Sequence, residues 1–227
     1  FMAPVVWKNG WPEFELGGDE VKYSYHINAV ADEKRELFNG NYLFHDDFTN
    51  NVLNIRYQFL RTVHNQWYNL TDKPGSLTLK LRPGTCAGTD NPSFVGFHQP
   101  HIKGYAAASL NFIPKVEYEK AGLLAFQNEK NYYYLCKSIK NGKQTVELYK
   151  GTELLVSKEV NVKVNKNIFL KIEAKADKYA FYFATKKNHW QVVLDNADGK
   201  YLSTKSAGGF VGCMYAMYAT SNGNASD

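Results

Sequence analysis

Cysteine is scarce in this chain, and its placement excludes two common architectures. The 227 residues contain three cysteines, Cys86, Cys136 and Cys213. They are far apart, odd in number and without Cys-x-x-Cys spacing, so neither a zinc site nor a disulfide framework is expected. Cys136 and Cys213 lie in apolar runs, and they are most simply interpreted as buried thiols.

Clusters of charge and long apolar runs are also missing. The chain has 27 basic and 22 acidic residues, a net charge of +5, and no run of five like charges. The lysines are scattered, which gives little support to nucleic-acid binding. No apolar run reaches the roughly 18 residues that a transmembrane helix requires. The sequence therefore predicts a solvated basic surface, with neither a nucleic acid nor a membrane as partner.

What the chain does have is aromatic side chains in short apolar runs. Aromatics make up 15% of the residues, with 16 Tyr and 14 Phe. Two runs, residues 121–126 and 132–136, flank a polar turn-like segment. Their short length, the turn residues on both sides and the aromatics of the second run favour strands over helices. They predict an antiparallel hairpin at the centre of a sheet that has one face on a core.

The same rhythm continues along most of the chain. Apolar and polar residues alternate over 54–60, 76–81 and 167–174, and Asn141-Gly142 is a hairpin turn signal. A long apolar strand is expected over 210–219. Turn signals recur roughly every 8–12 residues, the spacing of a sandwich or barrel. The sequence predicts an all-β fold, with two antiparallel sheets in a jelly-roll sandwich.

Several segments together resemble a known domain. They include His45-Asp46-Asp47-Phe48, residues 73–79, residues 94–99 and residues 208–216. In order and spacing they are similar to the C-terminal concanavalin A-like β-sandwich of family 43 glycoside hydrolases, the β-xylosidases and α-arabinofuranosidases. The resemblance implies a sandwich over residues 43–227. It also implies that residues 1–42 are a linker and the end of a preceding catalytic β-propeller, since residues 4–12 resemble the last piece of that propeller.

The resemblance implies a function for the chain as part of a larger enzyme. An accessory domain of this kind would support the catalytic propeller and help to shape its pocket for xylan or arabinoxylan fragments. The partners would be the propeller and a xylo- or arabino-oligosaccharide, and a secreted or periplasmic location is expected. Two other interpretations stay open: a self-sufficient, lectin-like carbohydrate-binding module, and a protein-interaction or oligomerisation sandwich without sugar affinity.

The chain alone is expected to be non-catalytic. Glycosidases hold two carboxylates at a fixed separation across the scissile bond. Asp46 and Asp47 are adjacent, so on a strand they would point to opposite faces. Asp195 and Asp198 flank a predicted turn, where Asp is common for backbone reasons. The resemblance implies that the three essential carboxylates lie in the catalytic propeller, outside this sequence.

Two sites are predicted from the resemblance. In the family a sandwich loop lies over the mouth of the propeller's pocket, so Phe97, His98 and His101 are expected near the carbohydrate. Family members often carry two arginines where this chain has Phe97 and His98, which changes what the loop can contact. No cofactor is required, but a structural calcium ion could bind Asp46, Asp47 and Asp227, because calcium prefers carboxylate and carbonyl oxygens.

Overall fold

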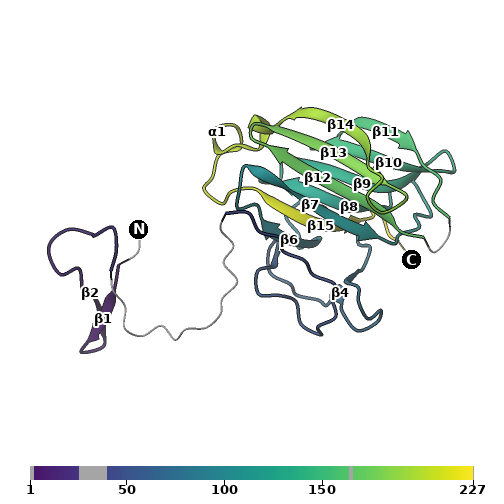
Figure 1. Cartoon of the computed structure of the whole chain (residues 1–227). Helices are drawn as coiled ribbons and strands as arrows, with labels where there is room; N and C mark the ends of the chain where they lie inside the picture. The colour runs from purple at the N-terminus through teal and green to yellow at the C-terminus, as the bar shows by residue number, and fades with distance from the viewer. Residues whose placement is uncertain (1–2, 26–39, 164–165, 227) are drawn as a thin grey trace. The chain divides into compact units, whose positions relative to one another are not determined.

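The computed structural model describes residues 3–25, 40–163 and 166–226. Contacts divide the chain into two units, residues 1–45 and 46–227. Apart from two short helices, the regular structure of the larger unit is all strand, and Figure 1 shows it as two stacked sheets. Neither of its helices in the described residues, η1 (Gly199–Leu202) and α1 (Thr204–Ala207), could span a membrane.

Both sheets are antiparallel. In order across the sheet, the seven-stranded one contains β11 (Glu153–Glu159), β10 (Lys143–Lys150), β9 (Tyr132–Lys140), β8 (Lys120–Phe126), β15 (Met214–Thr220), β6 (Ser93–His98) and β3 (Gln58–Phe59). The four-stranded one contains β14 (Gln191–Asp198), β13 (Lys178–Ala184), β12 (Ile168–Lys175) and β7 (Lys103–Leu110). A small ladder joins β4 (Tyr68–Asn69) to β5 (Thr78–Leu79). The predicted concanavalin A-like sandwich is confirmed.

The main core lies between the two sheets. Alternate residues of β12 point inward, and Ile168, Leu170 and Ile172 are each fully buried. They pack against the inward side chains of the large sheet, including Leu135 and Leu148. The alternation of residues 167–174 was therefore read correctly, and it determines which face of β12 meets solvent.

The hairpin of β8 and β9 is central, as predicted, but both of its faces are buried. Tyr134 and Cys136 project from β9 away from the main core into a second cluster, with Phe94 and Tyr218. Residue Cys86, from the segment before β6, also belongs to this cluster. Burial on two sides explains why these strands are continuous apolar runs rather than alternating ones.

Three expectations about strands were wrong in extent. Over 54–60 and 76–81 only Gln58–Phe59 and Thr78–Leu79 form ladders. The final strand begins at Met214, because the glycines around Phe210 have φ values of +74° to +81° that a strand does not use.

The smaller unit contains a hairpin that the sequence analysis did not predict. Strand β1 (Val5–Lys8) pairs with β2 (Trp11–Phe14) across an Asn9-Gly10 turn with positive φ at both residues. Asn-Gly is the sequence signal for this turn. The register places Trp7 opposite Pro12 and Val5 opposite Phe14, so these four residues share one face of the hairpin.

Candidate functional site

The loop at residues 99–102 connects the two sheets. It follows β6 of the seven-stranded sheet and leads into β7 of the four-stranded sheet. The Gln99 backbone N–H donates to the Cys213 carbonyl at 2.9 Å, and the Ala176 N–H donates to the Ile102 carbonyl at 2.8 Å. The Gln99 side chain donates to the His101 carbonyl at 2.9 Å. These bonds hold the loop to both sheets.

The three residues expected near carbohydrate do not form one cluster. Phe97 and His98 are successive residues of β6 and are half-buried, so their side chains leave opposite faces of the strand. The Phe97 ring contacts Tyr57 edge-on, with ring centroids 6.1 Å apart. His101 is exposed in the loop itself. Of the three, His101 is therefore the most accessible to a ligand at this end of the sandwich.

Tyr57 links the two sites that were predicted separately. Its ring lies 6.1 Å from that of Phe97, and its hydroxyl is hydrogen-bonded to Asp46. Burial, followed by the charge and hydrogen bond of Asp46, raises the pKa of Tyr57 well above its ordinary value. Tyr57 therefore stays a neutral hydroxyl at physiological pH, in contact with both Asp46 and Phe97.

The two aspartates predicted to bind calcium already accept hydrogen bonds within a tight turn. Oδ1 of Asp46 accepts from the Phe48 N–H at 2.8 Å, and Oδ1 of Asp47 accepts from the Thr49 hydroxyl at 2.9 Å. Asp227 lies outside the described residues. The described ranges contain no group of three or more His, Cys, Asp or Glu side chains that could hold a metal ion. Calcium at this turn stays a prediction.

A second loop, residues 208–212, reaches the same end of the molecule and was missed as a site. It ends at Cys213, whose carbonyl accepts from Gln99 of the first loop. At its tip Phe210 is 103% exposed and Val211 is 69% exposed. The sequence signal is Gly208-Gly209-Phe210-Val211-Gly212, in which glycines flank an apolar pair. We name loops 99–102 and 208–212 together the loop end.

Beneath the loop end lies the thiol of Cys213, which is only partly buried, unlike the fully buried thiol that the sequence predicted. Burial is the main reason that the pKa of Cys213 is raised to about 11, and the Tyr179 hydroxyl lies 3.7 Å from its Sγ. A thiol that holds its proton so strongly is a poor nucleophile. The loop end itself carries aromatic, imidazole and amide groups and no carboxylate. It can stack against a ligand and form hydrogen bonds, but it does not offer a pair of acids for hydrolysis.

The fold and the loop end define a concanavalin A-like sandwich with an exposed aromatic at one end. A sequence model described as the β-xylosidase C-terminal concanavalin A-like domain matches residues 45–227. The chain belongs to that family.

Curated relatives include a non-reducing end α-L-arabinofuranosidase of Bacteroides ovatus, 34% identical over 99% of this chain and 42% of the relative. A xylosidase/arabinosidase of Butyrivibrio fibrisolvens is 32% identical over 100% of this chain and 44% of the relative. The solved structure of the Bacteroides ovatus xyloglucan-locus protein GH43B superposes with a TM-score of 0.74 at 30% identity, over 99% of this chain and 44% of that one. The chain thus spans less than half the length of these relatives.

Proposed function

We propose that this chain is the non-catalytic sandwich domain of a glycoside hydrolase that acts on xylan- or arabinoxylan-type polysaccharides. It supports a catalytic propeller, and its loop end closes part of the substrate pocket. The relatives named above are about twice as long as this chain, which supports the proposal that it is one domain of a longer glycoside hydrolase. The single observation that carries the pocket role is the complete exposure of the Phe210 ring at the tip of a glycine-flanked loop.

An aromatic ring in this position costs free energy in water unless it contacts another surface. Full burial of a Phe side chain is worth roughly 1.5–3 kcal/mol. Phe210 and Val211 are adjacent and both exposed at the loop tip, and we infer that a partner covers this apolar pair. A pocket wall made by such a ring excludes water and orients a sugar without taking part in bond cleavage. His101 and the amide of Gln99 would supply hydrogen bonds beside it.

The test uses the complete enzyme, with the propeller present. We expect Phe210→Ala to lower kcat/KM on a xylo- or arabinoside about tenfold, which corresponds to about 1.4 kcal/mol. A triple variant, Phe97, His98 and His101 each to Ala, should have a similar effect. Ile113→Ala is the control, because Ile113 is 53% exposed and follows the other end of β7. Unchanged kinetics with unchanged melting temperature in both loop variants would mean that the loops are only connectors.

The β1–β2 hairpin offers a second contact with the propeller. Its shared face carries Trp7, 73% exposed, and Phe14, 74% exposed, whereas Trp11 lies on the other face opposite Lys8. We propose that the Trp7 face docks on the propeller. In the complete enzyme Trp7→Ala should lower the melting temperature, and Trp11→Ala should lower it less. Equal effects of the two substitutions would argue against docking through this face.

The chain on its own is expected to have no hydrolytic activity. Purified chain should leave a nitrophenyl xyloside or arabinoside intact. Turnover that disappears when acids of this chain are replaced would contradict the accessory role.

A further inference from the structure

The outer face of the four-stranded sheet carries polar and aromatic side chains. Because β12 turns Ile168, Leu170 and Ile172 into the core, its other residues, among them Lys171, Glu173 and Lys175, point outward. The register of β7 against β12 places Tyr105 opposite Glu173 and Lys103 opposite Lys175 on the same face. Figure 1 shows this sheet in front of the seven-stranded one.

A shallow groove, open to solvent, lies on this face between β7 and β12. It is lined by Lys103, Gly104, Tyr105, Glu173, Ala174 and Lys175. The groove is at the end of the sheet where loop 99–102 enters β7.

Three lysines lie side by side on neighbouring strands, at the end of the sheet that contains the groove. Lys175 lies opposite Lys103 on β7 and opposite Lys178 on β13. Like charges at directly opposite positions destabilise a sheet. A row of this kind requires negative charge beside it, from carboxylates of the chain or from a ligand.

Among the described residues, carboxylates pair with the central lysine of the row, Lys175, and with neither of its neighbours. The Lys175 ammonium lies 3.7 Å from Glu173 and 3.5 Å from Asp195, and it donates to the Tyr182 hydroxyl at 3.1 Å. In the part of the chain that the structure describes, Lys103 and Lys178 form no ion pair. Two cations therefore stay available on either side of Lys175.

The charge of the face fits a ligand with few negative charges. Four lysines and three carboxylates lie at outward positions of these strands, namely Lys103, Lys171, Lys175, Lys178, Glu173, Asp195 and Asp198. The excess is one positive charge. A polyphosphate or a nucleic acid would meet the carboxylates as well as the lysines, whereas a ligand with one carboxylate and several hydroxyls would match both.

Tyr105 gives the groove an aromatic wall. Its side chain is 59% exposed, and it stands next to the Glu173 carboxylate across the strand pair. Aromatic faces pack well on the C–H faces of pyranose rings, and carboxylates accept hydrogen bonds from sugar hydroxyls. Ammonium groups form short, charge-assisted hydrogen bonds with carboxylates.

We propose that this groove binds an acidic glycan through a pyranose unit that carries a carboxylate, that is, a uronic acid. Tyr105 stacks on the sugar ring, Lys103 binds the carboxylate, and Glu173 accepts from a hydroxyl. The site uses none of the residues of the loop end and performs no chemistry. It does not depend on the accessory role, and its failure would leave that role intact.

The test is calorimetric titration of the purified 227-residue chain. The probes are a xylo-oligosaccharide that carries one glucuronic acid, the same oligosaccharide with the carboxyl reduced to an alcohol, and inorganic polyphosphate. We expect the acidic sugar to bind at least tenfold more tightly than its reduced counterpart. Lys103→Gln and Tyr105→Ala should each weaken that binding at least tenfold without changing the melting temperature.

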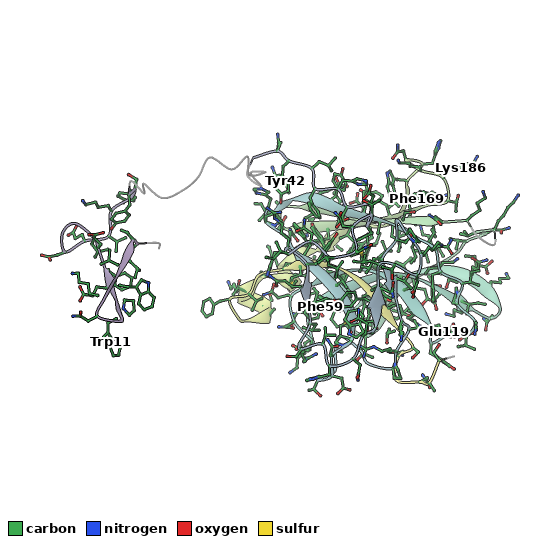
Figure 2. The ribbon with its side chains drawn as sticks, turned by 90° about the horizontal axis from the view of Figure 1, so that it is seen from below. Trp11, Tyr42, Phe59, Glu119, Phe169 and Lys186 are labelled. Atoms are coloured by element: carbon green, nitrogen blue, oxygen red, sulfur yellow. The ribbon has the colours of Figure 1, made fainter. Side chains whose placement is uncertain are left out.

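The control is Lys186→Gln, which removes the same charge elsewhere. Lys186 lies in the turn between β13 and β14, at the opposite end of the sheet from the lysine row, and is labelled in Figure 2. The affinity of the Lys186→Gln chain for the acidic sugar should differ less than twofold from that of the unsubstituted chain. Equal affinity for the acidic and the reduced sugar, binding of polyphosphate that Tyr105→Ala leaves unchanged, or no binding of any probe would each overturn the proposal.

Discussion

The Tyr179 hydroxyl donates a 2.7 Å hydrogen bond to Oε1 of Gln99, and so joins strand β13 to the loop that connects the two sheets. Tyr179 is only 5% exposed. Removing its hydroxyl leaves the Gln99 amide oxygen without this donor. We expect Tyr179→Phe to lower the free energy of unfolding by about 1 kcal/mol, the usual net value of such a bond.

Urea denaturation would measure this loss. Tyr105→Phe is the matched control, because Tyr105 is exposed and its hydroxyl should contribute within about 0.5 kcal/mol. If both substitutions had the same small effect, the bond to Gln99 would not hold the loop.

Two strand glycines should respond in opposite ways to alanine. A Cβ on Gly122 of β8 would lie 2.1 Å from the Leu135 carbonyl oxygen and 2.7 Å from Cys136 Cα. Backbone atoms of the neighbouring strand cannot move aside easily, so Gly122→Ala should cost at least about 3 kcal/mol, the upper end of what overpacking usually costs. Gly104 of β7 has nothing within 4 Å of its Cβ position, and Gly104→Ala should be neutral or stabilise by up to about 1 kcal/mol.

Thermal and urea unfolding of the two alanine variants would check this pair. A Gly122→Ala chain as stable as the wild type would show that β8 and β9 can separate locally, contrary to their tight register.

Glu147 is a buried acid whose partners come from two strands. Its carboxylate accepts from the Tyr149 hydroxyl at 2.6 Å and the Thr145 hydroxyl at 3.1 Å, and it lies 4.0 Å from Lys120 Nζ. The exposed fraction of its side chain is 4%, and that of Lys120 is 13%. Glu147→Leu should cost about 3 kcal/mol, because it leaves a largely buried ammonium without its counter-charge.

A double-mutant cycle would isolate the interaction energy between Glu147 and Lys120 from the other effects of each substitution. Adding Lys120→Met to Glu147→Leu should recover much of the loss, since two apolar side chains can replace a buried ion pair. A double variant that is less stable than the sum of the single effects would contradict this explanation.

Alkaline pH should destabilise the fold. Burial raises the pKa of Cys86 and of Tyr133 to about 12 and that of Cys213 to about 11. The unfolded chain would lose these protons from about pH 9 for the thiols and about pH 10 for the tyrosine. Above these values the folded state binds more protons than the unfolded state, so the free energy of unfolding falls as pH rises.

Chemical denaturation at pH 7, 8, 9, 10 and 11 would show the effect. We expect the free energy of unfolding to stay constant up to about pH 9, where the thiols of the unfolded chain begin to ionise. It should then decline steadily towards pH 11. Cys86 and Cys136 of the native chain should also resist alkylation near neutral pH, because both thiols are buried. Rapid alkylation of either thiol in the folded chain would disagree with this burial.

The sequence predicted those elements whose signals are local. The Asn141-Gly142 turn has positive φ at both residues and joins β9 to β10 as expected. The alternation in β12 identified its buried face. The Asn9-Gly10 turn carried the same local signal as Asn141-Gly142, yet the β1–β2 hairpin was not expected because the segment was read as a linker.

What could not be predicted depends on residues far apart in sequence. The groove exists because β7 and β12, which are separated by more than 50 residues, lie side by side with Lys103 opposite Lys175. Phe210 was assigned to a strand because it is apolar, and only the backbone of the neighbouring glycines shows that it stands in a loop. Asp46 and Phe97 were assigned to separate sites, and the Tyr57 ring between them connects the two.

The position of β15 has a consequence for the biosynthesis of this domain. This strand lies in the interior of the seven-stranded sheet, between β6 and β8, with Met217 paired to both Val95 and Leu123. A ribosome releases β6 and β8 long before β15, so for that interval their facing edges have no partner. Pairing over such a separation is slow, and unpaired strand edges promote aggregation. The domain is therefore a good candidate for chaperone protection during synthesis, and its yield should depend on how quickly the last strand arrives.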